Sequence, residues 1–162
     1  MAEPGPAPDP SLEALRRAHR RSYGLGLLLC LGVPLLLQAL LGRGIPAGDA
    51  DPAAVRDVGY TFTGLTFLAA ALALGRRGRA LARFGALEPS RRPGALARGV
   101  FGTALLALPC SLWGVLYWGM AGGARNAYAR AFIALTALFF LGFAPRWPAW
   151  RRALDGSPPS GT

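Results

Sequence analysis

The chain has 162 residues, of which 52% are hydrophobic and 16% are charged, where a soluble domain carries about 25% charged residues. The formal net charge is +10, and all eighteen basic residues are arginines. The arginines gather at the ends of apolar runs and form no single stripe with interleaved aromatic residues, so we exclude a nucleic-acid partner. We interpret them as markers of membrane topology.

The first apolar run follows a short basic segment. Residues 1–21 are predicted to form a cytoplasmic tail in which Leu12 to Arg21 is a short helix. Residues 23–41 are a longer apolar run than the core of a signal peptide, which has about 7 to 15 residues, so we interpret them as a retained membrane span. His19 has no second ligand or catalytic partner nearby in the sequence, and is interpreted as an ordinary interfacial side chain.

The second span is predicted at residues 58–75, which carry no charge. At about 1.5 Å per residue the run reaches about 27 Å, close to the thickness of a hydrocarbon core, about 30 Å. Small residues recur along it at steps of three and four, forming a seam of Gly59, Thr63, Thr66, Ala70 and Ala73. Because small residues let helices approach closely in lipid, we favour helix packing over substrate contact for this seam.

A basic loop is predicted at residues 76–98, which contain seven arginines. By the positive-inside rule this loop belongs in the cytoplasm and orients all the spans. Its first part, Arg76 to Leu87, is predicted to be an amphipathic segment at the membrane surface, which Pro89 and Pro93 end. Six arginines of the loop are predicted to contact anionic lipid headgroups or a partner protein: Arg76, Arg77, Arg79, Arg83, Arg91 and Arg92.

Two further spans, residues 99–119 and 127–143, complete a membrane domain predicted at residues 22–145. The N-terminal segment, the basic loop and the C-terminal tail at residues 146–162 hold fourteen arginines, and the outer regions hold four. The sequence therefore predicts an all-α, multi-pass protein of the cell membrane (the inner membrane in a bacterium). It is a bundle of four transmembrane helices with both termini in the cytoplasm.

A weak internal repeat relates Leu65–Leu68 to Leu135–Leu138, and an arginine follows each segment at the same distance. One interpretation is two tandem helical hairpins related by an axis along the membrane normal. Coincidence in a chain rich in Leu, Ala and Gly is the other, and the sequence leaves both open.

Polar residues are predicted to meet at the outer ends of the spans. Asp57 is the only acid next to a span and Arg130 is the arginine most clearly within one, so we expect them to pair or share a network. The structural interpretation is a clasp between the second and fourth spans, and the alternative is a binding site for an external polar ligand. The whole predicted cluster is Gln38, Asp57, Tyr60, Asn126, Tyr128 and Arg130. Gln38 is expected to hydrogen-bond a neighbouring helix.

No catalytic constellation is visible. Cys30 and Cys110 stand alone, no acid or histidine lies within a span, and Ser111 has no base there, so we expect no catalytic residue, cofactor or metal. The first hypothesis is a non-catalytic accessory or structural protein that associates with a membrane protein or with itself. The second is a small oligomeric channel or carrier, and the third is a lipid-modifying enzyme that uses the outer cluster. A channel would be lined by Gln38, Thr63, Thr66 and Thr136.

Overall fold

The computed structural model is all-helical and describes residues 10–43, 48, 50–121 and 126–156. The long helices are α1 (Pro10–Gly42), α2 (Pro52–Phe84), α3 (Arg92–Ala121) and α4 (Asn126–Phe143). A short 3-10 helix, η1 (Pro89–Arg91), precedes α3, and α5 (Trp147–Leu154) follows α4. Parts of the predicted tails 1–21 and 146–162, namely residues 1–9 and 157–162, lie outside the described residues.

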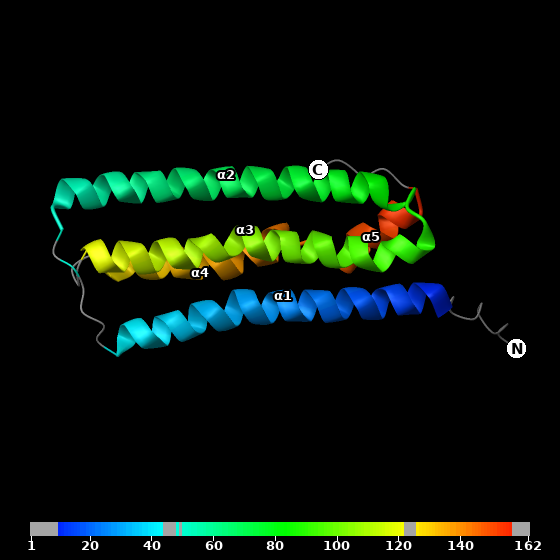
Figure 1. The fold of residues 1–162 in the computed structure, drawn as a ribbon, viewed down its shortest axis with the longest axis horizontal. Coiled ribbons are helices and arrows are strands. Elements are labelled where there is room, and N and C mark those ends of the chain that lie inside the picture. The colour runs from blue at the N-terminus through cyan, green and yellow to red at the C-terminus, as the bar shows by residue number, and fades with distance from the viewer. Residues whose placement is uncertain (1–9, 44–47, 49, 122–125, 157–162) are drawn as a thin grey trace, which may run out of the picture.

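Four stretches are long and apolar enough to cross a membrane: Ser11–Gly42, Pro52–Phe84, Pro89–Ala121 and Ala127–Leu154. This confirms the prediction of a multi-pass membrane protein built as a four-helix bundle. Figure 1 shows the long helices running side by side along one axis. We call the end that holds the start of α1, the end of α2, the start of α3 and α5 the arginine-rich end.

The central pair of the bundle is α3 and α4, which pack on one another along their length. The helix α1 packs on α3 and α4 from one side, and α2 packs mainly on α3 from the other (Figure 1). Consecutive helices α1 and α2 therefore flank the central pair, whereas α3 and α4 form a closely packed hairpin.

Two glycines allow close contact between neighbouring helices of the bundle. A Cβ atom on Gly114 of α3 would lie 2.5 Å from Cγ1 of Ile133 and 2.7 Å from the carbonyl oxygen of Ala129, both on α4. On α1, a Cβ atom at Gly26 would lie 2.7 Å from the ring of Phe140. These contacts leave no room for a side chain at either glycine, so the two sites set the helix spacing.

Two helices extend beyond the spans predicted from the sequence. The predicted basic helix Leu12 to Arg21 is the first part of α1, which is one continuous helix from Pro10 to Gly42. The helix α2 continues past the predicted span 58–75 to Phe84, so the first part of the predicted basic loop 76–98 is helical. Charge ends a hydrophobic span but does not end a helix, since arginine is a good helix former.

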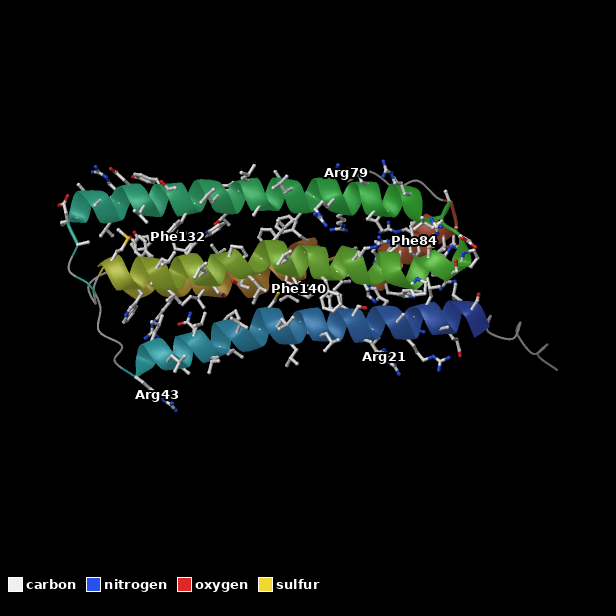
Figure 2. All side chains as sticks on the ribbon, in the orientation of Figure 1. Arg21, Arg43, Arg79, Phe84, Phe132 and Phe140 are labelled. Carbon is white, nitrogen blue, oxygen red and sulfur yellow. The ribbon has the colours of Figure 1, made fainter. Side chains whose placement is uncertain are left out.

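The helices are longer than a membrane is thick. Each of α1 and α2 has 33 residues, about 50 Å against a hydrocarbon core of about 30 Å. The extra length forms a small core of its own at the arginine-rich end, made by Leu15, Phe84, Leu96 and Trp150. Phe84 and Trp150 are fully buried there, with ring centroids 4.6 Å apart, which ties α5 to α2 (Figure 2 labels Phe84).

Candidate functional site

A pocket of about 400 Å³ lies between α2 and α3 at the arginine-rich end. Of the described residues that line it, five are arginines and none is an acid. The arginines are Arg76, Arg77, Arg79, Arg83 and Arg98. Five arginines along one cavity make it a candidate site for an anion, because a guanidinium group presents a planar fork of donors suited to phosphate or carboxylate.

The helix backbone holds two of these arginines. Arg79 donates its Nε–H to the carbonyl of Gly75 at 3.2 Å, and Arg98 donates its Nε–H to the carbonyl of Gly94 at 3.3 Å. A guanidinium has five N–H donors, so these bonds leave four donors on each group for other acceptors. Figure 2 labels Arg79 on α2, one turn from the end of the apolar span.

Arg76 packs across the helix interface onto α3. A Cβ atom on Gly102 would lie 3.1 Å from Nη2 of Arg76, so the missing side chain of this glycine makes room for the guanidinium. Deeper in the pocket the lining is small or apolar, with Ala73, Thr103 and Leu106. The pocket is therefore amphipathic. Its arginines lie toward the arginine-rich end, and its apolar wall lies toward the middle of α2 and α3.

The six arginines predicted to contact lipid or a partner have different environments in the structure. Four of them line the pocket, whereas Arg91 pairs with Glu88 at 3.7 Å. Arg92 donates to the carbonyls of Leu87 and Gly85, at 3.0 and 3.3 Å, and so fixes the turn between α2 and α3. Arg98 completes the pocket, and the prediction omitted it because an arginine immediately before a span resembles a simple topological marker.

At the opposite end of the bundle, the predicted polar cluster is partly assembled. Gln38 of α1 donates to the backbone carbonyl of Arg130 on α4 at 2.9 Å, so the expected interhelical hydrogen bond is present. The carboxylate of Asp57 lies 3.5 Å from Nε of Arg56, its neighbour in the chain. The predicted link between Asp57 and Arg130 stays a prediction. The side chain of Asn126 lies outside the described part of the chain.

Tyr60 and Tyr128, the other two members of the predicted cluster, line a second pocket of about 360 Å³. Tyr117 of α3 and Phe132 of α4 also line it, and Arg56 is its charged residue. Both predicted tyrosines are largely exposed, at 70% and 64% of their surface. The pocket is thus lined mainly by aromatic rings and has one arginine where the arginine pocket has five.

The small-residue seam of α2 packs against other helices of the same chain. Gly59 faces the ring of Tyr117, 3.2 Å from where its Cβ atom would lie, and Ala73 is buried in the central core with Ala70 beside it. The hydroxyls of Thr63 and Thr66 donate to the carbonyls four residues earlier, each at 2.8 Å. The seam therefore packs α2 on α3, and its threonines are satisfied by their own helix.

Two buried polar contacts were not predicted. The hydroxyls of Ser111 on α3 and Thr136 on α4 are hydrogen-bonded at 2.6 Å. His19 is buried, with only 6% of its surface exposed, and its Nε2 lies 3.1 Å from the carbonyl oxygen of Pro145. Trp150 donates its indole N–H to the same oxygen at 3.2 Å, so two side chains hold the connection between α4 and α5.

Within the described residues, no group of three His, Cys, Asp or Glu side chains is placed to hold a metal ion. Comparisons with protein-family models, with curated proteins and with solved structures found no match to this chain.

Proposed function

We propose that this chain is a non-catalytic integral membrane protein that holds anionic lipid headgroups at its arginine-rich end, with both termini in the cytoplasm. The observation that carries the proposal is the pocket between α2 and α3, which five arginines and no acid line. Basic pockets between transmembrane helices on the cytoplasmic side are sites for anionic lipid headgroups.

Charge along the whole sequence supports the orientation. The segments predicted to be cytoplasmic hold fourteen arginines and five acids, a net charge of +9. The segments predicted to face outward hold four arginines and three acids, a net charge of +1. This asymmetry favours insertion with the arginine-rich end in the cytoplasm.

An accessory or structural role requires contact with another membrane protein or with a second copy of this chain. The helix most available for it is α2, whose apolar window is the least buried of the four. Large apolar side chains such as Phe67 and Leu68 are exposed on it. Lipid covers this face in the isolated chain, and a partner helix would replace that lipid.

The hypothesis of a channel or carrier receives less support from the contacts. All four side chains predicted to line a path have partners inside the bundle. Gln38 bonds to the backbone of α4, Thr63 and Thr66 bond to their own helix, and Thr136 bonds to Ser111. Groups satisfied in this way are poor substitutes for the hydration shell of a solute. We therefore favour the non-catalytic function.

Two measurements test the proposal. Single cysteines introduced as Ser11→Cys and Asp155→Cys should react with a membrane-impermeant maleimide only after the cells are permeabilised, whereas Ala50→Cys should react in intact cells. The native Cys30 and Cys110 are buried and should give little background labelling.

Purification of the full chain in mild detergent should recover a larger fraction of anionic lipids than the membrane itself contains. Labelling of Ser11→Cys in intact cells, or recovery of lipids in the proportions of the membrane, would overturn the proposal.

A further inference from the structure

We propose that the arginine pocket selects a lipid whose phosphate headgroup carries two or more negative charges, such as a phosphomonoester, and that one acyl chain of this lipid lies on the apolar wall of the pocket. This inference rests on the anionic-lipid function proposed above and names the class of lipid.

The pocket carries a concentrated positive charge. Five arginines surround a cavity of about 400 Å³, and no acid lines it. A phosphodiester brings one negative charge, whereas a phosphomonoester brings about 1.5 to 2 at pH 7. Because like charges crowd in the empty pocket, the headgroup with more charge relieves more repulsion and accepts more charge-assisted hydrogen bonds.

The arginines of the pocket begin where the apolar stretches of α2 and α3 end. In α2 no charged residue lies between Asp57 and Arg76, and in α3 none lies from Gly99 to Ala121. Arg76 and Arg98 therefore stand where both apolar stretches end, at the boundary between hydrocarbon and headgroups. Arg83 lies seven residues beyond Arg76, about 10 Å further along the helix. The arginines thus cover the depth of a phosphate-bearing headgroup.

One wall of the pocket is apolar. Below Arg76 and Arg98 the pocket is lined by Ala73, Thr103 and Leu106, and the Thr103 hydroxyl already donates to the carbonyl of Gly99 at 3.0 Å. This wall offers no free side-chain donor to a soluble anion but matches an acyl chain. A lipid fills both parts of the pocket, whereas free phosphate fills only the charged part.

The experiment compares three lipids on the full chain in detergent micelles: phosphatidic acid, phosphatidylglycerol and phosphatidylcholine. Affinity is taken from the rise in melting temperature with lipid concentration. The native chain should bind phosphatidic acid at least about fivefold more tightly than phosphatidylglycerol, because the additional charge is worth about as much as one arginine near the surface.

The pocket variant is Arg76→Gln with Arg98→Gln, and its matched control is Arg21→Gln with Arg152→Gln. The control removes the same charge from exposed positions of the arginine-rich end that do not line the pocket. The pocket variant should bind phosphatidic acid about thirtyfold more weakly and lose its preference over phosphatidylglycerol. The control should keep that preference.

A third variant, Gly102→Leu, keeps every charge and fills the space beneath Arg76. The three atoms nearest to a Cβ atom at Gly102 all belong to the flexible end of Arg76, so we expect the helix contact to persist while the preference for phosphatidic acid falls. Equal weakening by the pocket and control pairs would overturn the inference while leaving the general anionic-lipid function in place. Stabilisation by inorganic phosphate as strong as that by phosphatidic acid would overturn the lipid source.

Discussion

Gly114 is a residue at which the packing of α3 on α4 tolerates little change. Any side chain there meets Ile133 at 2.5 Å and the backbone of Ala129 at 2.7 Å. Gly114→Ala should therefore force α3 and α4 apart and lower the free energy of unfolding by about 1 to 3 kcal/mol, the usual cost of overpacking. The measurement is unfolding of the purified chain in mixed micelles of mild detergent and SDS.

The control for this substitution is Gly64→Ala, since nothing lies within 4 Å of a Cβ atom at Gly64 in the middle of α2. An alanine there should be neutral or stabilise the helix by about 0.5 to 1 kcal/mol. If both variants lost the same stability, close contact at Gly114 would not be the cause.

The hydrogen bond between Ser111 and Thr136 gives a second test at single residues. Both hydroxyls are buried and lie 2.6 Å apart, on α3 and α4. A double-mutant cycle with Ser111→Ala and Thr136→Val should give a coupling energy of about 0.6 kcal/mol, and at most about 1.7, as for other hydrogen bonds between membrane helices. A coupling of zero would mean that each hydroxyl finds another partner when the first is lost.

Sequence reasoning anticipated the partner of Gln38 more readily than the partners of Ser111 and His19. An amide within a span has few ways to be satisfied except by another helix, so its hydrogen bond follows from its position. A serine or threonine can bond to its own helix, as Thr63 and Thr66 do, so a cross-helix contact requires knowledge of how two helices are rotated. The burial of His19 depends on α5, which no apolar run predicted.

At the scale of whole helices, hydropathy located the spans but not the helix ends. The apolar stretch of α2 ends at Gly75, yet the helix continues through Arg76 and Arg79 to Phe84. The chain leaves the helix only at the connection before Pro89, where proline removes a backbone donor. The predicted basic loop 76–98 therefore contains the end of α2 and the start of α3, and the pocket between α2 and α3 exists because both helices extend beyond the apolar stretches.

The short helix α5 depends on one side chain. Trp150 is fully buried against Phe84 and bonds to the carbonyl of Pro145. Trp150→Ala should remove about 3 to 5 kcal/mol of packing and release α5 from α2. Amide hydrogen exchange in α5 should then rise to the rate of a free peptide, while exchange in the spanning part of α3 stays slow. Exposed Arg151→Ala is the matched control and should leave exchange in α5 unchanged.

For the molecule as a whole, the order of helices across the bundle is the feature that sequence reasoning could not supply. Neighbours in the chain are usually neighbours in space, yet α3 and α4 separate α1 from α2. One close contact in this arrangement, Gly26 of α1 against Phe140 of α4, joins residues far apart in sequence. The tandem-hairpin interpretation of the repeat remains a prediction, since only the second hairpin packs on itself.

The depth of the bundle in the bilayer follows from its length and gives the last prediction. Trp113 is fifteen residues after Arg98 along α3, about 22 Å into a hydrocarbon core of about 30 Å. Trp150 packs on Phe84, which is eight residues beyond Arg76, about 12 Å outside that core. The four tryptophans of the chain can be reduced to either one by replacing the others with phenylalanine.

In vesicles of lipid brominated at the middle of the acyl chain, fluorescence of Trp113 should be quenched because this half-buried ring lies within reach of the bromine atoms. Fluorescence of Trp150 should change little, since it lies in the core formed beyond the arginines. Lipid brominated on the chain next to the headgroup serves as a control for depth. Equal quenching of the two rings by mid-chain bromine would place the arginine-rich end inside the hydrocarbon, where five arginines around one pocket would have no stable arrangement.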